Sequence, residues 1–446
     1  MVMSRTAIYR FVLVFTIFAF MDLTGSLFST TFGVIVKYIY TLTLLGFIFT
    51  YLVIGRSIVI NSVAPLLALF FFLITTVVFL FNLVAYGYKL SYASAFTSCL
   101  VFAAAAFIPQ TGLSIDIDRV LRQILFLLFV CTVLYLFEII FKSTSFGQSH
   151  SYITDPQFGK TLLSIVGLCL AILMRQRGLT WLFLIGIVAA LILRPSSTLV
   201  LAFAICLPLT ALLRYRALLF SRIFAYGFLA LAAAAPIILY VFHDEVGDAI
   251  GAMEMTVKSD ALGANPNTQF RMLVITLALR QLEGAAILYG SGLDGNTSVF
   301  VGRELPQWVD ETGSRVVTIH SDFVIVLTQA GIIGYSMFIT FFYFILHVRF
   351  RSLGHTARLH AGLYNMLSIS IVAVVCLMAY SMVNPNLQYY YISPPIWLLL
   401  LVSELAARAT VSSGGPDRVK ATVRNARLSR RMGATTGSQV ENPSSP

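Results

Sequence analysis

Apolar runs long enough to cross a membrane recur along most of the chain, and they limit its fold more than any other feature. A membrane-crossing helix needs about 20 predominantly apolar residues. Hydrophobic residues make up 58% of the sequence and charged residues only 11%, against about 25% charged in a typical soluble domain. So few charges cannot cover a water-facing surface. The sequence therefore predicts a polytopic membrane protein. It excludes a soluble enzyme or a nucleic-acid-binding protein, despite a formal net charge of +11.

Twelve runs are candidate spans, which predicts an all-α fold, a polytopic bundle of transmembrane helices. The sixth and seventh are short, so they form either a tight hairpin or segments that do not cross, in which case ten crossings remain. Both counts are even, which places both termini on one side. The candidate spans are residues 8–24, 33–54, 62–85, 91–109, 120–141, 161–174, 179–193, 197–213, 221–242, 322–347, 363–384 and 389–406.

Basic residues concentrate on alternate connections between the predicted spans. Under the positive-inside rule, the connections richer in lysine and arginine face the cytoplasm. We therefore expect both termini to be cytoplasmic. The richer connections carry Arg5, Arg10, Arg56, Arg119, Arg122, Arg175, Arg177, Arg214, Arg216, Arg222, Arg349, Arg351, Arg358 and Arg408. The alternate connections carry Lys37, Lys89, Lys142, Lys160 and Arg194.

This pattern divides the chain into four regions. Spans 1–9 occupy residues 1–242, and a large periplasmic loop occupies residues 243–320. Spans 10–12 occupy residues 321–407, and residues 408–446 form a basic cytoplasmic tail without apolar periodicity. The tail is predicted to be disordered, with a weak electrostatic hold on anionic lipid heads as its functional alternative.

The large loop holds about half of the chain's 19 acidic residues. Phe270, Leu273, Val274 and Leu277 recur within it at helix spacing, which predicts a partly helical, folded loop. The glycine pattern at 290–295 has the spacing of a dinucleotide-binding turn. That spacing carries a mechanism only between the strand and the helix of a βαβ unit. A predicted helix precedes it here, which favours a glycine turn that ends this helix.

His320 stands where the loop re-enters the membrane, directly before an apolar run. The positive end of a helix dipole lowers the pKa of a histidine and favours the neutral imidazole, which can act as a base. The same helix end attracts anions such as phosphate. An interfacial histidine that caps a helix is the alternative, and the residues alone do not decide between the two.

Three arginines are candidates for binding an anionic substrate. Arg271 and Arg280 lie nine positions apart, so they point to opposite sides of a regular helix. Arg194 begins the eighth span at its outer end. It is either an anchor at the membrane interface or a group that binds a phosphate from the outer leaflet.

The five cysteines all lie within apolar runs. Their spacing predicts neither a disulfide framework nor a metal site. We interpret them as small core residues.

Together these features resemble the O-antigen ligase and polysaccharide polymerase superfamily of bacterial inner-membrane glycosyltransferases, which includes WaaL-type ligases and Wzy-type polymerases. The resemblance rests on a large loop before the last three spans and on the arginine-led helix that begins with Phe270 and Arg271. It rests also on the glycine turn near Gly290, and on His320 followed by the glycine pair Gly331 and Gly334.

The resemblance implies a donor glycan carried on undecaprenyl pyrophosphate and a glycan acceptor, with no cofactor and no metal. In such enzymes arginines can stabilise the charge that develops on phosphate. Arg271 is the preferred candidate for binding the pyrophosphate, Arg194 is the second candidate and Arg280 is the third. His320 is then the base that accepts the proton of the acceptor hydroxyl.

The resemblance also implies a multi-pass protein of the bacterial inner membrane. Its other expected partners are membrane lipids, with a flippase and a chain-length regulator as candidate protein partners, and no nucleic acid.

Polymerisation of lipid-linked repeat units into exopolysaccharide or O-antigen is favoured over ligation to the lipid A core, which uses the same donor. A secondary transporter is the alternative of another class. It is less favoured because polar chemistry concentrates in one asymmetric loop. In a peptidoglycan-type polymerase, Asp294 or Asp310 would be more important than His320. A non-catalytic assembly protein is a further alternative.

Overall fold

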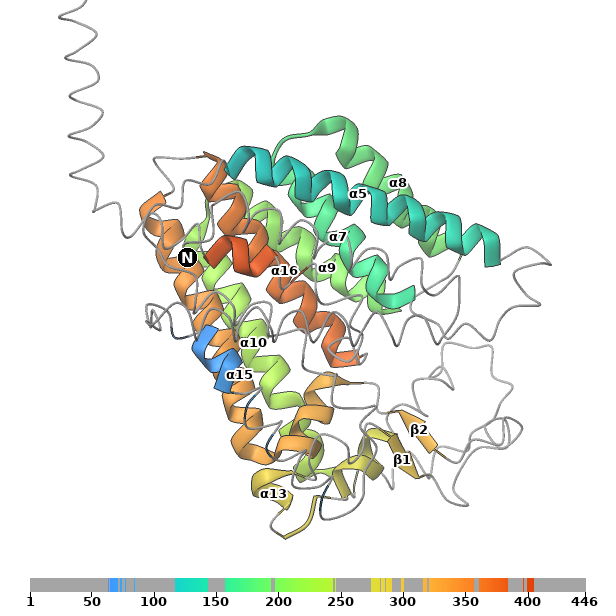
Figure 1. Cartoon of the computed structure of the whole chain (residues 1–446), viewed down its shortest axis with the longest axis vertical. Coiled ribbons are helices and arrows are strands. Elements are labelled where there is room, and N and C mark those ends of the chain that lie inside the picture. The colour runs from blue at the N-terminus through green and yellow to red at the C-terminus, as the bar shows by residue number, and fades with distance from the viewer. Residues whose placement is uncertain are drawn as a thin grey trace, which may run out of the picture.

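The fold is a bundle of apolar helices, seen in a computed structural model (Figure 1). The structure describes residues 63, 65–70, 73, 77, 84, 117–142, 157–193, 197–243, 245, 274–280, 282–284, 286–290, 298–300, 316–318, 321–356, 361–383, 396 and 399–404. The longer helices are α5 (Ile117–Lys142), α7 (Gln157–Leu173), α8 (Arg177–Leu193), α9 (Ser197–Arg214), α10 (Leu218–Val241), α15 (Asp322–Thr356) and α16 (Ala361–Val383).

These helices lie where the sequence predicts spans 5 to 11. Three stretches are long and apolar enough to cross a membrane: Leu218–Val241, Asp322–Gly354 and Ala361–Met382. The predicted helical membrane fold is therefore confirmed for this part of the chain. Twelve crossings and the full extent of the large loop remain predictions.

The described residues depart from the predicted all-α fold in one place. The short strands β1 (Ser298–Phe300) and β2 (Val316–Thr318) form an antiparallel pair in which Val299 lies opposite Val317. Both strands belong to the large loop and contain β-branched residues, which favour strands. Each strand has only three residues, which is too short for the alternating pattern of a strand to be recognised in the sequence.

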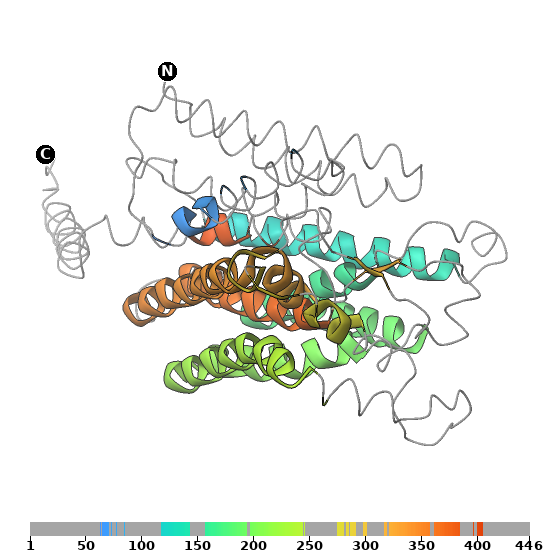
Figure 2. The same cartoon turned by 90° about the horizontal axis from the view of Figure 1, so that it is seen from below.

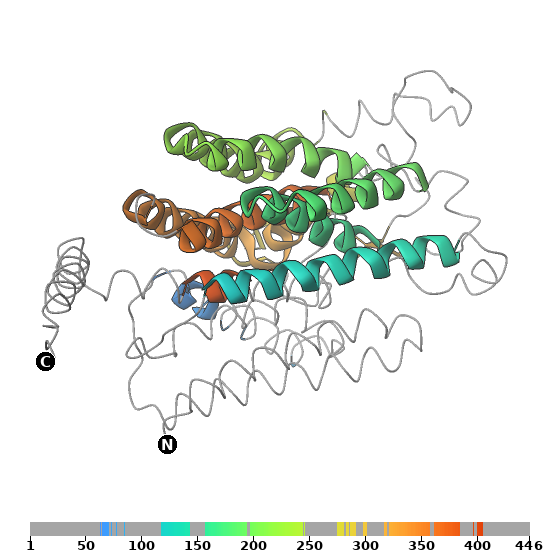
Figure 3. The same ribbon diagram turned by 90° about the horizontal axis from the view of Figure 1, so that it is seen from above.

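Helix α16 lies at the centre of the bundle. Figures 2 and 3 show α15 and α16 between α10 on one side and α5 on the other. Apolar residues surround α16 on all sides, as expected for a buried helix, and nearly all of its side chains are buried. Near its end, the Tyr380 hydroxyl lies 2.5 Å from Thr161 Oγ1 of α7. Near its start, the Tyr364 hydroxyl donates to Leu213 O of α9 at 2.5 Å.

Two tight turns connect neighbouring helices, one between α7 and α8 and one between α9 and α10. Arg175 and Arg216 occupy the left-handed region in these turns, with φ of 59° and 60°. After each arginine, a backbone N–H reaches back to close the preceding helix: Gln176 N donates to Ala171 O at 2.9 Å, and Ala217 N donates to Leu212 O at 2.8 Å. The pair α7 and α8 therefore forms the predicted tight hairpin, while its crossing of the membrane stays a prediction.

The described arginines of the richer predicted set gather at one end of the bundle. This end, which we call the arginine end, is formed by residues 117–122, 174–177, 213–222, 347–356 and 361–364 and lies at the upper left of Figure 1. Contacts between these segments hold it together. The Arg222 side chain donates to Phe350 O at 3.0 Å, and the Arg216 guanidinium lies 5.2 Å from the Tyr364 ring centre. The predicted alternation of basic connections is thus consistent with the described helices.

A buried ion pair joins α15 to the last predicted span at the arginine end. Arg349 pairs with Glu404, and both side chains are 0% exposed. Arg349 also donates to Leu400 O and to Ser403 Oγ, each at 2.9 Å. Such hydrogen bonds offset part of the cost of burying two charges.

Four of the five cysteines are described, and all four are buried, as expected of small core residues: Cys131, Cys169, Cys206 and Cys376. Cys99 lies outside the described residues.

Candidate functional site at the loop end

The opposite end of the bundle, which we call the loop end, is formed by residues 240–243, 274–280, 282–284, 286–290, 321–331 and 380–383. Three predicted site residues, His320, Arg271 and Arg194, lie outside the described residues. Of the predicted site residues, the structure places Arg280 alone, at the end of the helical segment 274–280. The described part of the candidate site therefore consists of the elements that flank these residues in sequence.

The helical segment 274–280 confirms part of the predicted loop helix, whose predicted start lies at Phe270 and Arg271. Its apolar face is buried, with Val274 and Leu279 both fully inaccessible. Ile275 is also buried. Arg280 is half-buried and its Nε atom lies in the interior. The loop thus packs onto the bundle at this point, and Arg280 lies at the end of the packed segment.

The end of α10 adds a second contact to the loop. The Tyr240 hydroxyl donates to Leu282 O at 3.3 Å. The His243 ring stacks on Tyr240 with 5.9 Å between ring centres, and its Nδ1 lies 2.6 Å from Tyr240 O. His243 is a candidate functional residue that the sequence reasoning missed. Its position at the boundary between a span and the loop was the signal that could have found it.

Two glycines permit a close crossing between the loop and α15. The four-residue helix α13 (Ala286–Tyr289) ends at Gly290, which has φ of 77°. A β-carbon on Gly290 would overlap the backbone of Gln329 and Ala330, and one on Gly331 would overlap the backbone of Leu288 and Tyr289. The predicted glycine turn at the end of a helix is confirmed at Gly290, although the helix that it ends is the short α13 and not the segment 274–280. Gly331 allows the close packing of the two backbones.

Gly331 also breaks α15 into two helices. Its φ of 61° and ψ of −169° are not helical. Residues 332–356 form a helix of about 37 Å, enough to cross the apolar layer alone, while residues 322–330 form a separate helix of about 13 Å. The residues from Ser321 to Ala330 are all buried. The chain thus re-enters the bundle after His320 as a short, enclosed helix.

Ser321 caps this short helix. Its hydroxyl accepts a hydrogen bond from Val324 N at 3.4 Å, the usual pattern of an N-cap, and donates to Ser381 O of α16 at 3.4 Å. Ser321 is therefore an N-cap of this helix, while the capping role that the sequence left open for His320 falls outside the described residues. His320 directly precedes this cap in the sequence.

The short helix carries polar side chains into the protein interior. Asp322 is 1% exposed and Gln329 is 2% exposed. Within the described part of the chain, neither Oε1 nor Nε2 of Gln329 has a hydrogen-bond partner. A buried amide left unpaired costs about 1–3 kcal/mol. Such an amide can donate two hydrogen bonds and accept two, which suits a ligand rich in hydroxyl or phosphate oxygens.

Comparison with known proteins adds no family to this picture. No family model matches the chain, and no curated protein matches it.

The described residues contain no group of three histidine, cysteine, aspartate or glutamate side chains that could hold a metal ion. What the loop end offers chemically is a helix N-terminus, buried hydrogen-bonding groups, and one arginine and one histidine from neighbouring segments.

Proposed function

We propose that the protein is an inner-membrane glycosyltransferase that polymerises undecaprenyl-pyrophosphate-linked repeat units into exopolysaccharide or O-antigen on the periplasmic face. One observation supports this above the others. The glycine turn at Gly290 and the glycine at Gly331, which carry the resemblance to this superfamily, interlock at one end of the bundle. They do so on the short buried helix that directly follows His320 in sequence.

In this proposal the chain's own residues divide the work of glycosyl transfer. His320 accepts the proton of the acceptor hydroxyl, whose oxygen forms a bond to the anomeric carbon of the donor glycan. The bond from that carbon to the phosphate oxygen breaks, and its electron pair leaves with undecaprenyl pyrophosphate. Arg271 and Arg194, with Arg280 as a further candidate, stabilise the charge on the departing pyrophosphate.

Ligation to the lipid A core would need the same donor site and a different acceptor. The two activities are distinguished by their products rather than by the residues at the loop end, so both are tested by one experiment.

A secondary transporter is the second candidate, and the break in α15 favours it. Discontinuous helices with buried polar groups form substrate sites in many transporters, and Gly331 and Gln329 provide both features. In those proteins the site lies near the middle of the membrane. Here the break lies about 13 Å from the start of α15, close to the loop end, which fits an interfacial site better.

The experiment that tests the proposed function is the profile of lipid-linked glycans in cells that lack the protein. The cells are complemented with the wild type, with His320→Ala, or with the matched control His355→Ala, whose histidine lies at the other end of α15. We expect single repeat units to accumulate without the protein and with His320→Ala, and to disappear with the wild type and the control. Long lipid-linked chains left untransferred would indicate a ligase. An unchanged profile would contradict both and favour transport.

A further inference from the structure

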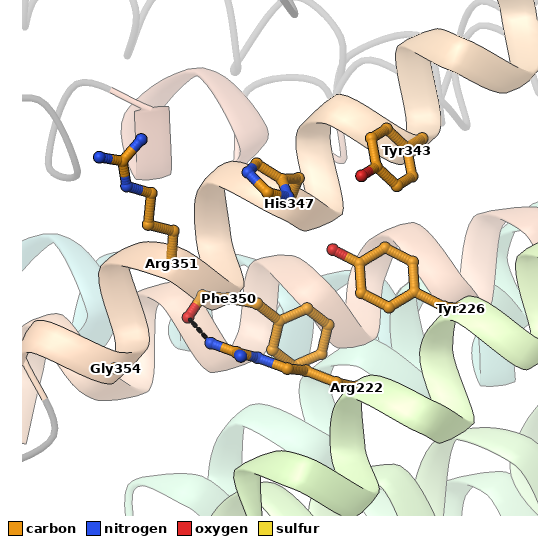
Figure 4. A pocket seen from close by; sticks show the side chains of 7 residues that line it. All are labelled: Arg222, Tyr226, Tyr343, His347, Phe350, Arg351 and Gly354. Atoms are coloured by element: carbon orange, nitrogen blue, oxygen red, sulfur yellow. Dashed lines mark hydrogen bonds between the residues drawn. The ribbon is translucent and has the colours of Figure 1, made fainter.

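A second site lies at the arginine end, far along α15 from the loop end. A pocket of about 670 Å³ opens between the first turns of α10 and the last turns of α15 (Figure 4). Two arginines, a histidine and three aromatic side chains line it. They are Arg222, Tyr226, Tyr343, His347, Phe350 and Arg351.

The Arg222 guanidinium is held in place at the base of this pocket. Its Nη2 donates to Phe350 O at 3.0 Å, and its central carbon lies 5.9 Å from the centre of the Phe350 ring. A guanidinium carries five N–H donors, and this bond uses one of them. A fixed, planar fork of donors matches the oxygens of a phosphate group.

Two tyrosines and a histidine form the wall beside Arg222. The Tyr226 and Tyr343 rings lie 5.6 Å apart, and in Figure 4 their hydroxyls point into the space between α10 and α15. Tyr343 stacks on His347 with 5.7 Å between ring centres. Tyr343, His347 and Arg351 follow one another at four-residue spacing, so they form one stripe along α15. The wall therefore presents polar groups that can donate hydrogen bonds.

The charge of this pocket is not balanced by its described lining. No acidic side chain is among the lining residues that the structure describes. Arg349 differs from the arginines of the pocket. It lies two positions before Arg351 on the same helix, yet it is buried and paired with Glu404. Arg351 instead is exposed, and Figure 4 shows it pointing away from Arg222 toward the rim.

The surroundings of the pocket are apolar. On α10, Phe220 lies two positions before Arg222 and Ile223 directly after it, and they are exposed at 64% and 63%. Exposed apolar side chains next to cations at a helix end are typical of the boundary between lipid tails and lipid headgroups. A ligand with both a phosphate and acyl chains would satisfy both surfaces.

We propose that this pocket binds the phosphate of an anionic phospholipid from the leaflet at the arginine end. The Arg222 guanidinium binds the phosphate oxygens, and the charge of Arg351 at the rim attracts the same headgroup. The tyrosine hydroxyls donate to this headgroup, and the acyl chains lie along the apolar face of α10. Basic pockets between helices at a membrane surface bind acidic headgroups in this way. The proposal does not depend on the proposed function at the loop end.

The test is native mass spectrometry of the purified full-length protein in detergent. Equal amounts of phosphatidylglycerol and phosphatidylcholine are added, and in a separate arm inorganic phosphate is added instead. We expect phosphatidylglycerol to be retained in preference to phosphatidylcholine. Each of Arg222→Gln and Arg351→Gln is expected to weaken its binding about fivefold.

Two variants keep the result interpretable. Arg351→Gln leaves the contact between Arg222 and Phe350 intact, so a folding defect is not expected there. Arg177→Gln removes an exposed arginine from the arginine end outside the pocket, and it should retain phosphatidylglycerol like the wild type. Equal binding of the two lipids, or an equal loss in Arg177→Gln, would overturn the proposal. Binding of inorganic phosphate without phosphatidylglycerol would overturn the lipid assignment.

Discussion

The two ends of the helical bundle differ in how their polar groups are solvated or paired. At the arginine end, cations lie on exposed turns or in an open pocket, and the buried arginine that is described there, Arg349, pairs with Glu404. At the loop end, the uncharged amide of Gln329 is enclosed without a hydrogen-bond partner in the described part of the chain. Water and lipid headgroups can solvate the first arrangement, while the second is costly unless a ligand completes it.

The two ends are also held together by different kinds of contact. The arginine end is held together by the Arg349–Glu404 ion pair, by the contacts of Arg216 and Arg222, and by tight turns. The loop end is organised by close backbone contact at Gly290 and Gly331, next to a short buried helix that includes the polar residues Asp322 and Gln329. The predictions below test that contrast.

The largest effect is expected from breaking the buried ion pair of the arginine end. Glu404→Gln leaves the Arg349 charge buried without its carboxylate, which typically costs about 3–5 kcal/mol. We expect a large drop in the thermal unfolding temperature of the purified protein. The control Arg351→Gln removes an exposed charge two residues away and should change stability by no more than about 0.5 kcal/mol. Equal effects of the two variants would show that the pair is not structural.

At the loop end, the strongest effect is expected from filling the glycine crossing. Gly331→Ala places a side chain at positive φ and against the backbone of Leu288, at a cost of about 2–3 kcal/mol. The matched control is Gly227→Ala on α10, where an added β-carbon meets nothing within 4 Å. That control should be neutral or stabilising, because alanine favours a helix over glycine. Thermal unfolding of both variants compares them, and equal destabilisation would argue against the crossing.

Gln329→Leu separates stability from function at the loop end. The change removes an enclosed amide without a described partner and keeps a similar volume, so we expect a gain of about 1–2 kcal/mol in stability. If the loop end binds a polar substrate through Gln329, the same variant loses glycan polymerisation in complemented cells. A stabilised variant with full activity would mean that the amide serves no ligand, and a destabilised one that it is paired.

The smallest effect is expected at the turns of the arginine end. Arg175→Gly relieves a left-handed conformation and should stabilise the protein by about 0.5–1 kcal/mol. Arg216→Gly relieves the same strain but loses the contact with the Tyr364 ring, which offsets a similar amount. The difference between the two unfolding temperatures measures that contact, and a larger gain for Arg216→Gly would contradict it.

Much of the fold could be predicted because apolar length and helix spacing are strong local signals. The spans around Leu218–Val241 and Ala361–Val383 fall within a few residues of the predicted ones, and the basic connections gather at one end as the charge pattern indicates. The turn at Gly290 was predictable from backbone chemistry, since glycine tolerates positive φ far better than other residues.

What the sequence could not provide is the set of contacts between distant segments. The pairing of Arg349 with Glu404 depends on packing of the last span against α15, although a lone acid in an apolar run was a signal for a partner. The enclosed position of Gln329 and the contact of His243 with Tyr240 depend on how the loop folds back. The break in α15 looked like a continuous apolar run because hydropathy does not report φ and ψ.

The central claim is that the loop end is the site of glycosyl transfer, and purified protein tests it most directly. The protein is reconstituted in liposomes with undecaprenyl-pyrophosphate-linked repeat units, and release of undecaprenyl pyrophosphate is measured for the wild type, His320→Ala and His355→Ala. We predict release coupled to longer glycans by the wild type and His355→Ala, and a loss of at least about 100-fold with His320→Ala, the contribution usual for a general base. Release that is absent from the wild type, or equal in all three proteins, would contradict the claim.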